Sequence, residues 1–301
     1  MEKILITGSG LLASSLFKKF PDSECFVTYN RNQSINNNSI FLDITDKNQL
    51  EKIILRLKPD TIIHTAAITN LDWSEKNQTR TFSVNSEATH NIKNLAKKID
   101  SKLVFISTDS VFDGKIGDYK EEDEVNPVNI YSKSKVLAEK HVIEYEKALV
   151  VRGTFFGLKN GVKESFFSYL LNELRNGRNI RVPKDKISNG LFVEDFSHVI
   201  SEMCKKELCG VYHVGSLGFE NNVDFAKSFS EACNFDKELI KQCLFEEIFE
   251  ERKLVAKRPL NTVLNIEKIS KEIKMPTVGE VITSCTKKYG VTVQSEDEAL
   301  E

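Results

Sequence analysis

Short apolar segments rich in branched residues alternate with helical stretches along the first half of this chain of 301 residues. The apolar segments cover residues 3–7, 25–29, 61–65, 103–107 and 149–152, and helices are predicted over 11–20, 47–57, 83–99 and 129–146. Such alternation is typical of βαβ units, whose parallel sheet is covered by helices on both faces. Residues 1–155 are therefore predicted to form an α/β domain with a Rossmann-like, doubly wound parallel sheet. Ligands of such sheets bind beyond the carboxyl ends of the strands.

The alternation weakens after residue 155. Helices are expected over 164–176, 193–206, 222–233 and around 237–252, and short strands over 180–183 and 210–214. These elements predict a smaller mixed α/β region for substrate binding over 156–290, with a return to the first domain near 188–215. The acidic residues 291–301 lack core-forming side chains, so a disordered tail is expected.

The composition indicates which kinds of molecule the protein binds. Lys and Arg number 42 against 44 Asp and Glu, a net charge of −2, so nucleic acid is not an expected partner. Six scattered cysteines without a CxxC pair read as reduced thiols, and five dispersed histidines predict no metal site. The amino terminus begins directly as a strand and no apolar run approaches the roughly 20 residues needed to span a bilayer. We expect a cytoplasmic protein with a small-molecule partner and no membrane contact.

A glycine turn follows the first predicted strand, in the order Gly8-Ser-Gly10-Leu-Leu-Ala13. Gly8 permits a tight turn, Gly10 lets the backbone approach a pyrophosphate, and the small Ala13 allows the helix to pack closely on the strand. Gly8, Gly10, Leu11, Leu12 and Ala13 are therefore candidate dinucleotide-binding residues. A purely structural strand-to-helix turn is the alternative.

The end of the second predicted strand bears on the choice of cofactor. Asn30 and Arg31 stand there, with no carboxylate to bind a ribose 2′-hydroxyl. Arg31 could instead pair with a 2′-phosphate, which predicts NADP(H) as the preferred cofactor. NAD(H) stays open, because an exposed loop arginine is equally common.

Three shorter stretches are further candidates for cofactor contact. Asp43, followed by Ile44, could accept a hydrogen bond from an adenine amino group, and Ala66 and Ala67 could pass beneath the cofactor. Asn85 is the third candidate. Helix capping, packing and a helix start are the respective alternatives.

Tyr131 and Lys135 form a candidate acid–base pair. They are four residues apart on a predicted helix and share one face, where an ammonium group can favour proton release from a phenol. Thr108 ends the fourth predicted strand, and its hydroxyl could hydrogen-bond a carbonyl oxygen that gains negative charge. A cap or turn is the common alternative for such a threonine.

Several motifs occur in a recognisable order. Ser107-Thr-Asp-Ser-Val-Phe-Asp-Gly114 is close to STDYVFDG, and Pro127-Val-Asn-Ile-Tyr131-Ser-Lys-Ser-Lys135 is close to PxNxYGxxK. Residues 151–156, 210–215 and 258–264 agree with later motifs of the same family. Over residues 3–285 the chain resembles the extended short-chain dehydrogenase/reductase superfamily, and within it the dTDP-4-dehydrorhamnose reductase-like branch.

The resemblance implies roles for individual residues. Tyr131 would donate a proton to the reduced carbonyl, Lys135 would lower its pKa and hold the nicotinamide ribose, and Thr108 would assist at the same oxygen. The implied substrate-binding residues are Asp109, Val111, Phe112, Phe155 and Arg258. The implied activity is NADPH-dependent reduction of a keto group, foremost the 4-keto group, of a nucleotide-linked deoxysugar in polysaccharide or glycan precursor biosynthesis.

The chain departs from the family pattern in three places. The glycine turn is one residue shorter than usual, Ser110 replaces a Tyr, and Phe155 stands where Trp is frequent. The sugar pocket could therefore have a different shape, and rhamnose itself is not implied. An epimerase or dehydratase, a non-catalytic NADP-binding regulatory subunit, and a homodimeric assembly stay open.

Overall fold

The computed structural model describes residues 1–30, 38–158 and 165–289, and its centre is a parallel sheet of seven strands in the order β11-β6-β5-β4-β1-β2-β3. The strands are β1 Lys3–Thr7, β2 Glu24–Tyr29, β3 Ser39–Phe41, β4 Thr61–His64, β5 Lys102–Ile106, β6 Ala148–Gly153 and β11 Gly210–Val214. Every neighbouring pair is parallel. The prediction of a doubly wound Rossmann-like sheet is confirmed.

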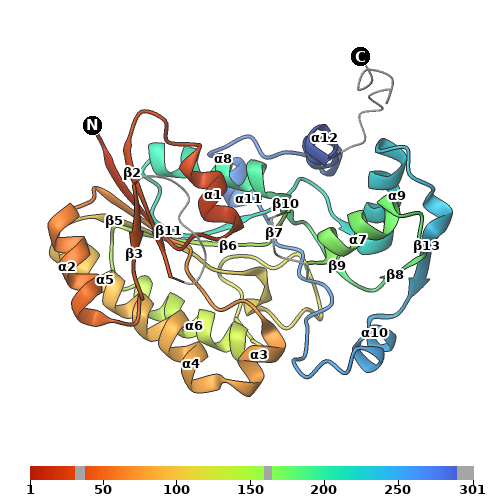
Figure 1. Cartoon of the computed structure of the whole chain (residues 1–301), viewed down its shortest axis with the longest axis horizontal. Helices are drawn as coiled ribbons and strands as arrows, with labels where there is room; N and C mark the ends of the chain where they lie inside the picture. Colours follow the sequence, from red (N-terminus) through yellow and green to blue (C-terminus); the bar gives the residue numbers. More distant parts are fainter. Residues whose placement is uncertain (31–37, 159–164, 290–301) are drawn as a thin grey trace, which may run out of the picture.

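Helices cover both faces of this sheet (Figure 1). One face packs against α2 Lys47–Leu57, α5 Ala88–Lys98 and α6 Ile130–Val142, with the short α3 Leu71–Lys76 and α4 Gln78–Phe82 beside them. The other face packs against α1 Leu11–Phe17, α8 Val193–Lys205 and α11 Glu267–Ser270. Alternate residues of each strand therefore pack into two separate apolar layers, one on each face of the sheet. The carboxyl ends of the strands lie at one edge of the sheet.

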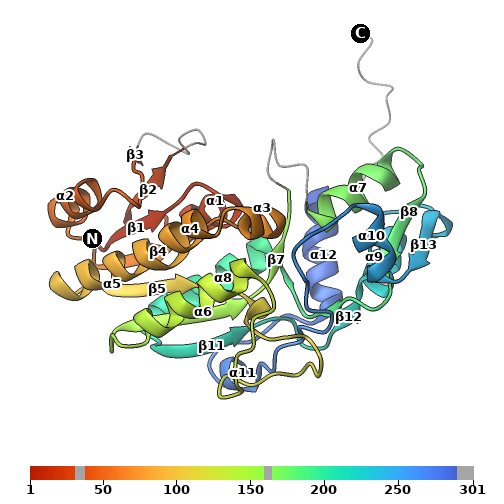
Figure 2. The ribbon, with the colours of Figure 1, turned by 90° about the horizontal axis from the view of Figure 1, so that it is seen from below.

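A smaller lobe lies beside the sheet and stands at the right of Figure 2. Its helices are α7 Phe166–Arg175, α9 Asn222–Ala232, α10 Phe245–Glu251 and α12 Val278–Tyr289. Three strand pairs accompany them: β7 Phe155–Phe156 with β10 Leu191–Phe192, β8 Ile180–Pro183 with β13 Ile240–Cys243, and β9 Ile187–Ser188 with β12 Glu220–Asn221. One apolar core runs from Ile4 on β1 to Phe229 on α9, so the lobes share a core. No helix within the described residues is long and apolar enough to cross a bilayer.

Several predicted elements differ from the observed ones. The helix expected over 83–99 begins with a π-helical turn, Ser83–Glu87, which separates α4 from α5. The helical prediction around 237–252 is wrong for Ile240–Cys243, which form β13 because they pair in parallel with β8. The sequence predicts neither β3 and α3, which are only 3 and 6 residues long, nor α12, which has 12 residues. The predicted tail 291–301 lies outside the described residues.

A late segment, residues 255–265, crosses back from the smaller lobe onto the sheet lobe. Leu264 pairs with Tyr119 in an isolated parallel bridge. Gly114 has φ +74°, and a Cβ atom there would lie 2.5 Å from Cβ of Pro259, so glycine permits this close approach. The contact holds the loop after β5 between the two lobes.

Candidate active site

A cleft of about 830 Å³ opens at the carboxyl ends of the strands, a size within the range of cofactor-binding pockets. Most of the residues that the sequence proposed for cofactor, catalysis and substrate line it: Gly8, Gly10, Leu11, Leu12, Ala13, Asn30, Asp43, Ile44, Ala66, Ala67, Thr108, Tyr131, Lys135 and Phe155. Lining residues that the sequence analysis missed include Thr28, Tyr29, Ile68, Thr69, Trp73, Arg80, Ser107, Thr154 and Ser165. Segments up to about 157 residues apart in sequence thus form one surface.

The glycine turn forms the floor of the cleft between β1 and α1. Gly8 has φ +93°, and a Cβ atom there would lie 3.0 Å from Cα of Ala66. Gly10 directly precedes α1, and a Cβ atom on it would meet no atom within 4 Å. The fold therefore needs glycine at position 8, whereas at position 10 it leaves open space in front of the helix. The first amides of α1, which a helix leaves without intrahelical acceptors, belong to residues of this surface.

Asp43 lies at the end of the cleft near β2 and β3. Its Oδ1 accepts hydrogen bonds from the Thr45 amide at 2.9 Å and the Thr45 hydroxyl at 2.7 Å, and Arg80 lies 3.3 Å from Oδ2. Partial burial raises the pKa of this carboxyl, but the bonds from Thr45 and the Arg80 charge outweigh it, so the pKa lies below its usual value. Asp43 is ionised at neutral pH and can accept a hydrogen bond from a ligand. Arg31 lies outside the described residues.

Asn85 is buried behind the cleft rather than on its surface. Its Oδ1 accepts from the Ile68 amide at 2.8 Å, and its Nδ2 donates to the Ile68 carbonyl and to Ser134 Oγ, each at 3.0 Å. Asn85 thus connects the loop after β4, which lines the cleft, to α6. Asn85 is not among the residues that line the cleft; its observed bonds position Ile68, which is.

His64 is fully enclosed and makes two hydrogen bonds. Thr89 donates its hydroxyl proton to the Asn85 carbonyl, so its oxygen accepts from His64 Nε2 at 2.9 Å, and Nδ1 accepts from Thr7 at 2.6 Å. Burial and the Lys135 charge lower the pKa of His64 to about 3. The ring is therefore neutral and structural, and His64 is not an acid or base of this site.

Helix α6 places Lys135 next to the sheet. Asn129 caps the helix by accepting from the Ser132 amide at 2.8 Å. The Lys135 ammonium donates to the Ile106 carbonyl at 2.7 Å and lies 4.0 Å from the centre of the Phe105 ring. Burial lowers the pKa of Lys135 to about 7, and the charge of Glu139 opposes this shift.

Tyr131 lies one turn earlier on α6 and lines the cleft. Burial raises its pKa to about 12, a hydrogen bond with Thr108 opposes the shift, and the negative charge of Asp109 adds to it. The phenol is therefore protonated at neutral pH, which is the form that donates a proton. The Lys135 ammonium, one turn along the same helix, binds the Ile106 carbonyl, and its effect on the Tyr131 pKa, which the family resemblance implied, stays a prediction.

A buried ion pair supports this helix from below. Arg152 on β6 donates to Glu139 at 2.8 Å, and both side chains are less than a tenth exposed. Ser107 also donates its hydroxyl proton to Glu139. Because that proton is used, Ser107 presents only acceptor lone pairs to the cleft it lines. Glu139 follows Lys135 by four residues, and continuing the row of Tyr131 and Lys135 would have found it.

Asp109, Val111 and Phe112 do not line the cleft, although the resemblance implied contact with the substrate. Asp109 is buried and accepts from Thr262 at 2.6 Å and from Thr108 at 3.1 Å. Val111 and Phe112 are fully buried. Among the five implied substrate residues, Phe155 is the one that lines the cleft.

The Arg258 guanidinium also binds other groups of the protein. Its Nη2 lies 2.6 Å from Asp72 Oδ2, and its Nη1 donates to the Ala256 carbonyl at 2.6 Å. Asp72 accepts from the amides of Val255 and Ala256 as well. Partial burial raises the Asp72 pKa, but the bonds from Arg258 and these amides outweigh it and hold the pKa at about 2. Arg258 therefore ties the late segment to α3 and does not line the cleft. Among the described residues, no group of three His, Cys, Asp or Glu side chains is placed to hold a metal ion.

Comparison with known proteins gives one family and three informative relatives. The family model described as RmlD substrate binding domain matches residues 1–290. A dTDP-4-dehydrorhamnose reductase of Aggregatibacter actinomycetemcomitans is 29% identical over 89% of this chain and 92% of that protein. The methionine adenosyltransferase 2 subunit beta of Bos taurus is 26% identical over 77% of this chain and 70% of that protein. The crystal structure of dTDP-4-dehydrorhamnose reductase from Bacillus anthracis in complex with NADP has the same fold, with a TM-score of 0.84 at 24% identity over 96% of this chain and all of that chain.

Proposed function

The chain belongs to the RmlD substrate binding domain family, and we propose that it is an NADPH-dependent reductase of a keto group, foremost the 4-keto group, of a nucleotide-linked deoxysugar. The observation that carries this proposal is the convergence of Thr108, Tyr131 and Lys135 on the cleft that the glycine turn also lines. A relative named dTDP-4-dehydrorhamnose reductase, matched over nearly its whole length, supports the substrate class. The product would enter polysaccharide or glycan precursor synthesis.

The described residues fit a dinucleotide. The open space in front of Gly10 and the amides at the start of α1 suit a pyrophosphate. Asp43 is ionised and suits an adenine amino group, and Lys135 suits the nicotinamide ribose. Bound NADPH supplies the hydride. Arg31 favours the 2′-phosphate form, and the NADP complex of the Bacillus anthracis relative agrees with this preference.

The protein's own side chains supply the proton for the reduction. As hydride reaches the carbonyl carbon, the oxygen takes the proton of Tyr131, so that C=O becomes CH–OH. Thr108 donates a hydrogen bond to the same oxygen, for which its hydroxyl turns away from Asp109. The phenolate left behind is stabilised by the neighbouring Lys135 and recovers a proton from solvent.

A non-catalytic NADP-binding subunit is the second candidate. The relative named methionine adenosyltransferase 2 subunit beta favours it, and such a protein would need the cofactor cleft alone. The presence of Thr108, Tyr131 and Lys135 in this cleft favours catalysis instead.

Oxidation of NADPH and NADH, measured against a panel of nucleotide-linked 4-keto-6-deoxysugars, tests the proposal. We expect stoichiometric NADPH consumption with at least one member, at a higher kcat/KM than with NADH. An epimerase or dehydratase would convert a substrate without net consumption. NADPH binding without turnover of any member would favour the regulatory subunit.

A further inference from the structure

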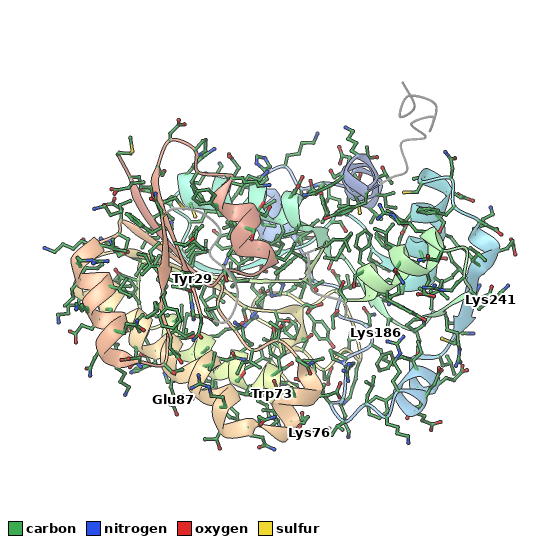
Figure 3. The ribbon with its side chains drawn as sticks, viewed as in Figure 1. Tyr29, Trp73, Lys76, Glu87, Lys186 and Lys241 are labelled. Carbon is green, nitrogen blue, oxygen red and sulfur yellow. The ribbon has the colours of Figure 1, made fainter. Side chains whose placement is uncertain are left out.

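Lys186 lies between β8 and β9 on the smaller lobe, in a segment to which no motif was assigned. Figure 3 shows its side chain on the inner side of that lobe, whereas Lys241 lies on the outer edge. The Lys186 ammonium donates to the Pro259 carbonyl at 2.6 Å and lies 5.6 Å from the centre of the Phe245 ring. The late segment and α10 thus enclose it on two sides.

The carboxylates around Lys186 are each held by other donors. Asp185 accepts from the Phe245 amide at 2.8 Å, at the start of α10. Asp109 accepts from Thr262 at 2.6 Å. Among the ion pairs of the described residues, none includes Lys186.

An enclosed ammonium with one carbonyl acceptor has hydrogen-bonding capacity left, because it carries three donors. Burial lowers the pKa of Lys186; the charges of Asp109 and Asp185 oppose this shift, and that of Arg258 adds to it. An anionic ligand would compensate the partly buried positive charge. The Lys186 ammonium can therefore bind an anionic ligand.

Hydrogen bonds connect the segment of Lys186 to the catalytic groups. Thr262 donates its amide to the carbonyl of Ile187, the residue after Lys186, at 2.9 Å, and its hydroxyl to Asp109, the residue after Thr108, at 2.6 Å. In a nucleotide-linked sugar the diphosphate lies across the sugar ring from a 4-keto group. A substrate whose keto group meets Tyr131 therefore directs its diphosphate away from the sheet, toward the smaller lobe.

We propose that Lys186 binds the diphosphate of the nucleotide-linked sugar, beside the guanidinium of Arg258 that Asp72 holds in place. This inference rests on the proposed function. Lys186, in the connection between β8 and β9, would then contact the substrate directly, and Arg258 would lie beside it. Charge-assisted hydrogen bonds to phosphate oxygens are strong, so the loss of one should be visible in binding.

The test is calorimetric titration of the full chain, saturated with NADPH, with dTDP, UDP, GDP and CDP and with the four corresponding nucleosides. Lys186→Met is compared with Lys184→Met, since Lys184 is exposed two residues earlier on the same segment. We expect Lys186→Met to weaken the best nucleoside diphosphate at least tenfold while its nucleoside and NADPH bind as before. Lys184→Met should leave all of these affinities unchanged.

Lys186→Arg is the control for poor folding of a variant at this position. It keeps the positive charge, so its diphosphate affinity should lie within a few-fold of that of the parent. Unchanged diphosphate affinity in Lys186→Met overturns the inference about Lys186 alone. Equal weakening of nucleoside and diphosphate also overturns it, because that indicates a packing role. If the parent protein binds NADPH but none of the four diphosphates, the proposed substrate class fails together with the inference.

Discussion

Replacing Lys135 by methionine should make the free protein more stable while abolishing turnover. The folded state holds the Lys135 ammonium under the sheet, 3% exposed, with a pKa of about 7 against an ordinary value of 10.5. At 1.36 kcal/mol per pKa unit, this burial costs the folded state on the order of 5 kcal/mol as an upper limit. Methionine keeps the length of the side chain and removes the charge.

The lost hydrogen bond reduces this gain. The Ile106 carbonyl loses its donor, which costs roughly 1–3 kcal/mol. We therefore expect a net stabilisation of about 2 kcal/mol at pH 6. Between pH 7 and 10.5 the unfolded chain binds the proton and the folded chain does not, so the parent protein regains stability as pH rises through this window. The advantage of Lys135→Met should vanish by about pH 10.

Urea unfolding followed by circular dichroism at pH 6 and pH 10 measures both expectations. Lys133→Met is the matched control, because Lys133 is exposed on the same helix. A Lys135→Met variant that is less stable than the parent at pH 6 would refute the reasoning. An advantage of equal size at both pH values would refute it as well, since it would show that the charge is not the cause.

Three further changes probe the parts around the site. Glu139→Gln should lower the free energy of unfolding by about 3 kcal/mol, because it leaves Arg152 as an unpaired buried cation. Methionine at both positions should recover most of this loss. An unchanged urea midpoint in Glu139→Gln would contradict the prediction. Asn85→Ala should cost about 2 kcal/mol through its lost hydrogen bonds to Ile68 and weaken NADPH several-fold; parent-like stability argues against that role. Gly8→Ala should weaken NADPH binding at least tenfold in a fluorescence titration, since its Cβ would press on Ala66 at a positive φ, and unaltered affinity would be the contrary result.

The sheet could be predicted from sequence because its signals are local. Each strand of the first half is a short apolar run next to a helical stretch, and the order of such units implies a parallel sheet. The glycine turn, Asp43, the alanines at 66 and 67, and the Tyr131–Lys135 pair all follow strand ends or helix starts, so their place on one rim follows from topology. The strand at 240–243 was missed because its partner lies 60 residues earlier in the chain.

The other half of the site depends on contacts between distant segments. Arg258 meets Asp72 across 186 positions, and Asp109 meets Thr262 across 153, and no local pattern indicates either contact. Val111 and Phe112 belong to a recognisable motif, but a motif does not say which members pack inward. Lys186 stands in no motif, and its place beside the late segment becomes visible only in three dimensions.

The central claim is that Tyr131 gives the proton to a carbonyl reduced at this cleft. Its most direct test is NADPH oxidation by Tyr131→Phe with the best keto-sugar substrate of the parent protein, together with the dissociation constant for NADPH. General acid catalysis contributes on the order of 10²–10⁴ in rate, so the variant should lose at least about a hundredfold in kcat while binding NADPH as tightly as the parent. Turnover that persists in Tyr131→Phe, or a loss of NADPH binding that accounts for the lower rate, would contradict the role of Tyr131.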